Sequence, residues 1–229
     1  MVERLADGVW LLDLGLFPPL ATSGYLIDDG DLTLVDPGLF WNRPTLRTEI
    51  ERAGYALSDL DRVLVTHWDL DHAGGLGALV PAFDGPVYLG AADLALVRGE
   101  SHPPLLHHKG LFHRVARRLF PLPAGLTYRS VADGDRIGSF RAVHTPGHNP
   151  GHTVFVHDSG VAFLGDLVWG QEGGLRPPFW GDSYDMAEIR ASIRAFAERA
   201  PDFEVAAMAH GEPVRSGGRE ALRDLAARL

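Results

Sequence analysis

The sequence contains no cysteine among its 229 residues. This absence excludes a thiol nucleophile, a disulfide framework and a thiolate metal site. Any metal ion must therefore be held by histidine, aspartate, glutamate or backbone oxygen. Such ligands suit zinc, iron or manganese.

Long apolar runs and a positive charge excess are also missing. No stretch approaches the roughly 20 apolar residues of a membrane-spanning helix, and the N-terminus lacks the basic and apolar regions of a signal peptide. We therefore expect a cytoplasmic protein without a membrane partner. The net charge of -9 disfavours binding of nucleic acid, because the phosphate backbone is bound by clustered Lys and Arg. We therefore expect a small-molecule substrate as the partner. The sequence does not predict an oligomeric state.

The order of apolar patterns predicts the fold class. Short strands with turn residues between them are expected at 9–14, 25–28, 32–36, 62–66, 87–89, 141–144, 153–156, 161–164 and 205–209. Helical spacing is expected at 44–53, 73–80, 91–97, 186–199 and 219–229. Two mixed β-sheets packed face to face, with helices on both outer sides, accommodate this order as a four-layer αββα sandwich. We expect one domain over residues 1–229.

Residues 99–125 differ from the rest of the chain. They are rich in proline, contain four histidines and include the basic run RVARRL. One interpretation is a lid that recognises an anionic or bulky group. The other is a solvated helix face between proline-rich turns.

The segment THWDLDHAGG, residues 66–75, concentrates potential metal ligands directly after an apolar strand. At a strand end the chain leaves the pleat, so a loop can aim several side chains at one centre. The alternative interpretation is a polar loop in which Asp71 caps the next helix. The candidate ligands here are His67, Asp69, Asp71 and His72.

Three further strand ends carry the same kinds of side chain. HTPGHNPGHT at 144–153 follows one strand, VAFLGD ends at Asp166, and VAAMAHG contains His210. A single histidine on an apolar strand is usually a core residue, but four such junctions favour convergence on a metal site.

These motifs resemble those of the metallo-β-lactamase fold superfamily, in its glyoxalase II-like branch. The resemblance covers nearly the whole chain and includes LVDPG at 34–38, FLGD at 163–166 and AHGEP at 209–213. It implies two divalent metal ions, with zinc first and iron or manganese as alternatives. The implied ligands are His67 and His148 for the first ion, Asp71, His72 and His210 for the second, and Asp166 as a bridge. Asp36 and His152 are implied to support these ligands without binding metal, and His144 receives no role.

One position departs from the family pattern H-x-H-x-D-H, because Asp69 replaces the middle histidine. If Asp69 binds metal, the extra negative charge should hold the cation harder and acidify bound water less. It should also shift the preference toward iron or manganese. Alternatively, Asp69 does not reach the centre and only one ion binds tightly.

The resemblance implies a hydrolase in which a metal-bound hydroxide attacks an ester, thioester, lactone or phosphoester, with Asp71 orienting it or relaying a proton. The alternative is a diiron or mononuclear iron oxidoreductase, since flavodiiron proteins share the fold and carry a carboxylate at the position of Asp69. A third class is a non-catalytic member with structural metals. Trp68 and Tyr184 are the candidate substrate-binding residues, with Phe179 and Trp180 as further candidates for the pocket wall.

Overall fold

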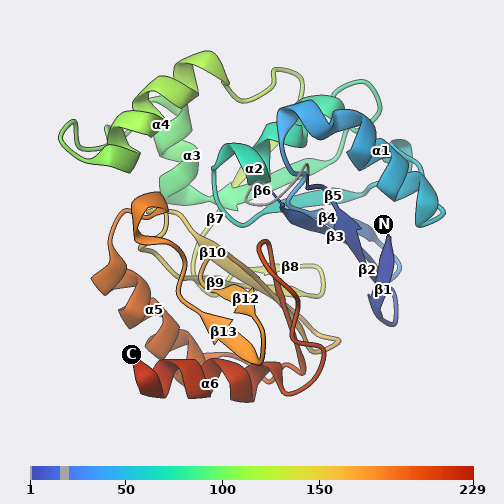
Figure 1. Cartoon of the computed structure of the whole chain (residues 1–229). Helices are drawn as coiled ribbons and strands as arrows, with labels where there is room; N and C mark the ends of the chain where they lie inside the picture. Colours follow the sequence, from blue (N-terminus) through green and yellow to red (C-terminus); the bar gives the residue numbers. More distant parts are fainter. Residues whose placement is uncertain (1, 16–20) are drawn as a thin grey trace.

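The computed structural model describes residues 2–15 and 21–229, except for the side chains of residues 42–45. Two mixed β-sheets pack face to face, and helices cover both outer sides (Figure 1). This is the four-layer αββα sandwich predicted from the sequence.

The first sheet has seven strands in the order β1-β2-β3-β4-β5-β6-β7. Its first four strands pair antiparallel, and β4 to β7 pair parallel. The strands are β1 (Glu3–Ala6), β2 (Val9–Asp13), β3 (Ser23–Asp28), β4 (Leu32–Val35), β5 (Arg62–Val65), β6 (Pro86–Gly90) and β7 (Thr127–Val131). On its outer side lie α1 (Arg43–Arg52), α2 (Leu70–Ala73), α3 (Ala91–Arg98) and α4 (His108–Leu119) (Figure 1).

The second sheet has five strands in the order β14-β11-β10-β9-β8. They are β8 (Arg136–Ile137), β9 (Phe140–His144), β10 (Thr153–His157), β11 (Val161–Gly165) and β14 (Val205–Met208). Only β11 and β14 pair parallel in this sheet. Its outer side carries α5 (Met186–Arg199) and α6 (Gly218–Arg228), and a separate hairpin joins β12 (Trp169–Gln171) to β13 (Gly174–Arg176). Short 3-10 turns are η1 (Phe40–Asn42), η2 (Leu57–Asp59), η3 (Gly74–Ala78) and η4 (Trp180–Asp182).

Alternation along the strands builds three apolar layers. On β3, Tyr25 and Ile27 face the opposite sheet, whereas Leu26 packs beneath the outer helices. The Tyr25 ring lies 5.3 Å from the ring of Phe163 on β11, so the two sheets are in direct contact. Because strands such as β11 are buried on both faces, they appear in the sequence as continuous apolar runs.

The helix predicted at 73–80 is wrong in its start and in its type. The α-helical turn begins at Leu70, before His72, and the chain continues from Gly74 as 3-10 helix. The glycines explain the departure: the backbone N–H of Gly75 donates to Gly38 O at 2.7 Å, and a Cβ on Gly75 would lie 2.2 Å from Pro37 O. The segment is shaped by this close backbone approach rather than by helix propensity.

Among residues 2–15 and 21–229, no helix has the length and apolar character needed to cross a membrane.

Candidate metal centre

Four strand ends bring the predicted ligands to one edge of the sandwich. The loop after β5 carries His67, Asp69, Asp71 and His72, and the loop between β9 and β10 carries His148. Asp166 directly follows β11, and His210 follows β14. All seven side chains contribute to groups whose ligand atoms lie within 4.8 Å of one another.

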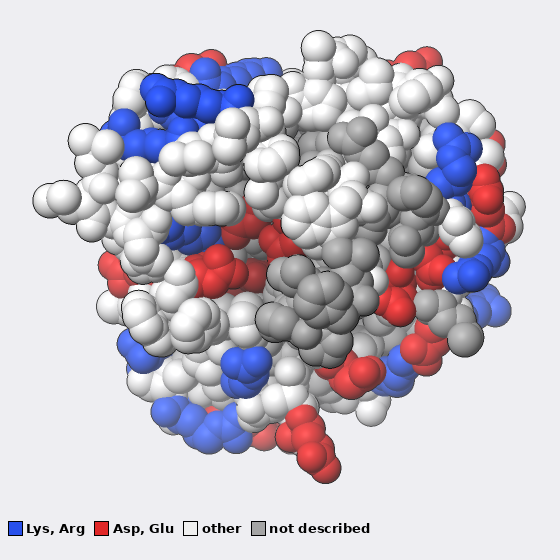
Figure 2. Space-filling model, turned by 45° about the horizontal axis from the view of Figure 1, so that its top comes forward, with Lys and Arg blue, Asp and Glu red and all other residues white. Residues whose placement is uncertain are grey.

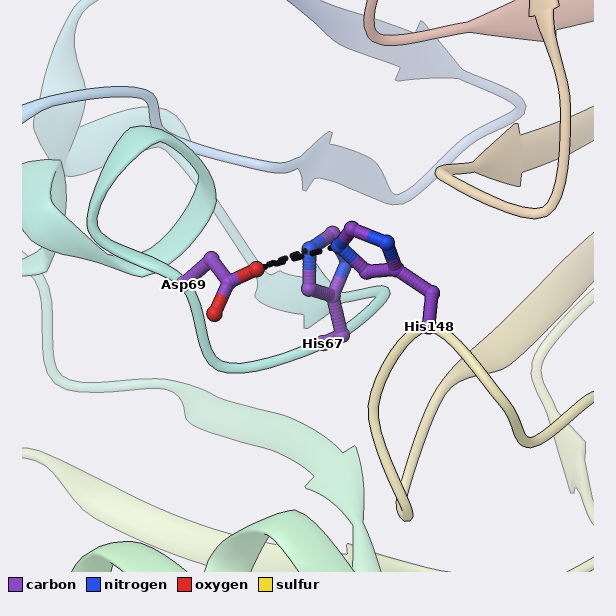
Figure 3. Close-up of side chains that lie close together, drawn as sticks. All are labelled: His67, Asp69 and His148. Carbon is purple, nitrogen blue, oxygen red and sulfur yellow. Dashed lines mark hydrogen bonds and ion pairs between the residues drawn. The ribbon is translucent and has the colours of Figure 1, made fainter. Parts of the chain in front are cut away.

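The first group consists of His67, Asp69 and His148, whose side chains point toward one another (Figure 3). Asp69 Oδ2 lies 3.2 Å from His67 Nε2 and 3.0 Å from His148 Nε2. Metal–nitrogen bonds of about 2.0–2.1 Å in a tetrahedral site separate ligand atoms by roughly 3.3 Å. The spacing therefore suits a small divalent ion, and Asp69 does reach the centre.

The second group consists of Asp71, His72 and His210, with Asp166 beside it. Asp71 Oδ2 lies 3.2 Å from His210 Nε2 and 3.6 Å from His72 Nε2. Asp166 Oδ1 lies 3.7 Å from His72 Nε2, and its Oδ2 lies 3.5 Å from both His210 Nε2 and His148 Nε2. Asp166 therefore faces both groups, as a bridging carboxylate would.

Three buried atoms in these groups lack a hydrogen-bond partner in the described structure: His67 Nε2, His72 Nε2 and Asp166 Oδ1. Each unpartnered buried polar atom costs about 1–3 kcal/mol. All three belong to predicted ligands. His72 Nε2 and Asp166 Oδ1 lie in or beside the second group, whose donor set therefore fits a divalent ion.

The other nitrogen of the ligating histidines is held by the protein. His72 Nδ1 lies 2.9 Å from Asp36 Oδ2, and His210 Nδ1 lies 2.8 Å from the carbonyl oxygen of Ala21. Each contact places a proton on Nδ1, so Nε2 is the nitrogen left to bind a metal ion at the centre. Asp36 also accepts from the Thr66 backbone N–H and hydroxyl, at 2.8 and 2.7 Å.

His152 lies inside the centre but is not placed as a ligand. Its Nε2 accepts from the backbone N–H of Asp166 at 3.0 Å, and its Nδ1 lies 2.8 Å from Thr145 Oγ1. Since both ring nitrogens are engaged, the residue positions Asp166. The supporting roles that the sequence assigned to Asp36 and His152 stay predictions. The unassigned His144 bonds to Pro150 O.

Two side chains that the sequence analysis did not single out enter the first group from α4. Lys109 is 2% exposed, and its Nζ lies 2.7 Å from Asp69 Oδ2 and 2.9 Å from His148 Nε2. His113 Nε2 lies 2.6 Å from Asp69 Oδ1. The sequence signal that could have revealed them is their spacing of four residues, which places both side chains on one helix face. The buried Ala116 lies on the same helix.

A third missed residue, Asp93 on α3, joins the two ligand loops. Its Oδ2 accepts from the backbone N–H of Trp68 at 2.8 Å, and its Oδ1 accepts from that of Gly151 at 2.6 Å. Asn149 Nδ2 donates to the same carboxylate at 3.2 Å. Burial raises the pKa of Asp93. Asp93 thus fixes residues 68 and 151 relative to each other.

In the first group, the charges leave Asp69 ionised and His67 neutral. Burial acts to raise the pKa of Asp69, but the charge of Lys109 and the hydrogen bond to His113 help to hold it well below its usual range. Burial, followed by the neighbouring His72, lowers the pKa of His67 well below its ordinary value. An anionic oxygen and a free imidazole lone pair therefore face each other.

In the second group, carboxylates favour protonated histidines when no metal is bound. Burial acts to lower the pKa of His72, but Asp71 and Asp36 outweigh it and raise the pKa to about 9. Burial likewise acts to lower the pKa of His210. Asp166 and Asp71 outweigh it and raise this pKa to about 11. The same negative charge that favours these protons favours a divalent cation.

The two candidate substrate-binding residues, Trp68 and Tyr184, are packed against other side chains near the centre. Trp68 is buried in the core beneath the helices. The Tyr184 hydroxyl lies 2.8 Å from His113 Nδ1, and its ring stacks on His107 with centroids 5.1 Å apart. Phe179 and Trp180 are exposed.

An apolar cavity adjoins this region, and one face of the molecule is hollowed. Figure 2 shows acidic and basic side chains next to each other in a hollow near the middle of one face. The cavity has a volume of about 630 Å³. It is lined by Trp68 and Leu70 of the metal loop (residues 66–75), together with Phe40 and residues 119–123. No ligand side chain lines it.

The family model described as the metallo-beta-lactamase superfamily matches residues 17–210. The chain belongs to this superfamily. A "probable metallo-hydrolase YybB" of Bacillus subtilis is 30% identical over 194 residues, covering 82% of this chain and 81% of that protein. A hydroxyacylglutathione hydrolase of Aeromonas salmonicida is 28% identical over 143 residues, covering 61% of this chain and 44% of that protein. These relatives agree with the glyoxalase II-like resemblance.

A solved structure, described as TTHA1623 in a di-iron-bound form, superposes with a TM-score of 0.66. It is 28% identical and covers 90% of this chain and 94% of that chain. The αββα arrangement is therefore shared over nearly the full length of both.

Proposed function

We propose that this chain is a metal-dependent hydrolase of a small-molecule ester, thioester, lactone or phosphoester. The observation that carries the proposal is the second group, in which Asp71, His72, His210 and Asp166 converge from three strand ends. The buried, unpartnered His72 Nε2 and Asp166 Oδ1 are the atoms that a divalent ion would satisfy. The ion, when bound, would supply Lewis acidity and lower the pKa of a water molecule.

Asp71 is proposed as the residue that orients the attacking water and accepts its proton. Its side chain is 28% exposed, whereas the Asp166 side chain is 1% exposed. Asp71 is therefore the carboxylate of this group that solvent and substrate reach. A positioned carboxylate of this kind contributes about 10²–10⁴-fold to rate.

The relatives support the reaction class without defining the substrate. Two of them are named as hydrolases, one for hydroxyacylglutathione. The sequence predicted two ions, zinc first, and the related TTHA1623 is described in a di-iron form. For this chain, the metal and the number of ions stay predictions.

The experiment is a metal-reconstitution assay. Protein stripped with a chelator is reloaded with Zn²⁺, Mn²⁺ or Fe²⁺ and tested on a generic ester, thioester, lactone and phosphodiester. We expect no turnover without metal, turnover of at least one substrate with metal, and a loss of about 10²-fold or more in kcat for Asp71→Asn. Asp158→Asn is the control, because Asp158 is an exposed acid paired with Arg136 on the surface.

The iron oxidoreductase alternative predicts a different outcome. A protein that purifies with iron, changes its visible spectrum with oxygen and cleaves none of the four substrates contradicts the hydrolase proposal. A colourless zinc or manganese protein that cleaves an ester contradicts the redox alternative.

A further inference from the structure

Each N–H donor of the Lys109 ammonium group has a hydrogen-bond acceptor inside the protein. Its Nζ lies 2.7 Å from Asp69 Oδ2, 2.9 Å from His148 Nε2 and 2.7 Å from the carbonyl oxygen of Asp182. A lysine ammonium has three N–H donors. The three acceptors use all of them, so this buried side chain is held in one place.

Two of these acceptors are the atoms with which Asp69 and His148 would bind the first metal ion. The Ser183 hydroxyl donates to Phe179 O at 3.0 Å, so its oxygen is free to accept from His148 Nδ1–H at 3.2 Å. The proton of His148 is then on Nδ1, and the single lone pair of Nε2 points to Lys109. One lone pair cannot bind a metal ion and accept from Lys109 at the same time.

Charge leads to the same conclusion. The family pattern has a neutral histidine where this chain has Asp69, and this chain adds the positive charge of Lys109 against that carboxylate. His113 contacts the other oxygen of Asp69 at 2.6 Å, so α4 holds the carboxylate at both oxygens. A divalent ion near Asp69 Oδ2 and His148 Nε2 would lie close to the ammonium and be repelled by it.

The second group makes no direct contact with this cation. Within the described structure, no hydrogen bond or ion pair joins Lys109 to Asp71, His72 or His210. His72 Nε2 and Asp166 Oδ1 keep their unpartnered state. The conflict between ammonium and metal is therefore confined to the group of His67, Asp69 and His148.

We propose that Lys109 takes the place of the first metal ion, so that the chain binds one divalent ion, in the group of Asp71, His72, His210 and Asp166. The proposal rests on the metal dependence in the proposed function. The test counts bound ions. A count of two would contradict the single-ion proposal without affecting the hydrolase proposal, and an absence of hydrolysis would leave a count of one unaffected.

The test is a titration of chelator-treated protein with Zn²⁺ alone, read by native mass spectrometry and by calorimetry. We expect one ion per wild-type chain and two per chain for Lys109→Met, which keeps the length and packing of the side chain but removes its charge. Arg118→Met is the matched control: it removes an exposed cation from the same helix and should leave the count at one.

His148→Gln keeps the proposal testable if Lys109→Met does not fold. If the first group holds no ion, wild type and His148→Gln both bind one Zn²⁺, whereas in a two-ion centre the count falls from two in wild type to one in the variant. Two tightly bound ions in the wild type would overturn the proposal. A folded Lys109→Met protein that still binds only one ion would also overturn it, because Lys109 would then not be what excludes the second.

Discussion

Asp36 Oδ2 lies 2.9 Å from Nδ1 of His72, and this hydrogen bond decides which ring nitrogen faces the metal centre. Asp36 is also the only non-glycine residue with a positive φ, 52°, in the part of the chain that the structure describes. Such a backbone persists where the surroundings hold it. Here the backbone N–H of Asp36 donates to Leu64 O, and Thr66 donates to both of its carboxylate oxygens.

Asp36→Asn should weaken Zn²⁺ binding by about 10- to 100-fold, because the ligand loses an anionic partner on its distal nitrogen. Asparagine tolerates positive φ, so the backbone conformation is kept. The dissociation constant measured by competition with a chromophoric chelator checks this, with Asp158→Asn as the surface control. An unchanged constant would mean that Asp36 only supports the backbone.

Zinc binding at pH 7.5 should release about two protons from the second group. With pKa values raised to about 9 and about 11, His72 and His210 are protonated in the metal-free protein and must be neutral to bind metal. Calorimetry in buffers of different ionisation enthalpy counts the protons. Histidines at their ordinary pKa would release far fewer than one in total.

The stability of the metal-free protein should fall with rising pH. A pKa raised on folding stabilises the fold fully below the unfolded value of about 6.5, and this stabilisation is lost as pH rises through the folded value. The loss attributable to His72 and His210 therefore extends upward through about 9 and about 11. Urea unfolding from pH 6 to 10 should show a smaller loss for His210→Gln. Equal slopes for both proteins would contradict the assignment.

Asp93→Ala should lower the free energy of unfolding by about 2–4 kcal/mol. The change leaves the buried backbone N–H groups of Trp68 and Gly151 without their acceptor, at roughly 1–3 kcal/mol for each one that finds no substitute. Asp7→Ala, at an almost fully exposed site, should change it by less than about 0.5 kcal/mol. Denaturant unfolding of the metal-free proteins measures both, and a cost below 1 kcal/mol for Asp93→Ala would show that the loops hold without it.

The cavity beside the metal loop should accept the apolar part of a substrate. If it does, kcat/KM rises about fourfold per added methylene across a series of acyl esters, from about 0.8 kcal/mol per buried CH₂. Val80→Trp, at the cavity wall, should abolish this rise, whereas Val115→Trp, exposed on α4, should not. A flat wild-type series would exclude the cavity as an acyl site.

The sequence predicted what is encoded locally. His67, Asp69, Asp71 and His72 lie within six residues after a strand, so their convergence follows from one loop. Lys109 could not be predicted in the same way, since its contact with Asp69 spans 40 residues and depends on how α4 packs over the centre. The helix predicted at 73–80 failed for a related reason: the contact of Gly75 with Pro37 and Gly38 is tertiary. The strands β1, β8, β12 and β13 have two to four residues each, too few to be distinguished from loops, and β7 is mostly exposed and lacks an apolar run.

The most direct test of the account is the hydrolysis rate as a function of Zn²⁺ equivalents added to chelator-treated wild-type protein, with a substrate that the reconstitution assay has identified. A single-ion hydrolase should show a rate that rises linearly and reaches its plateau at one equivalent per chain. A rate that stays near zero up to one equivalent and rises only toward two would contradict the single-ion hydrolase. The absence of any metal-dependent rate would contradict the hydrolase itself.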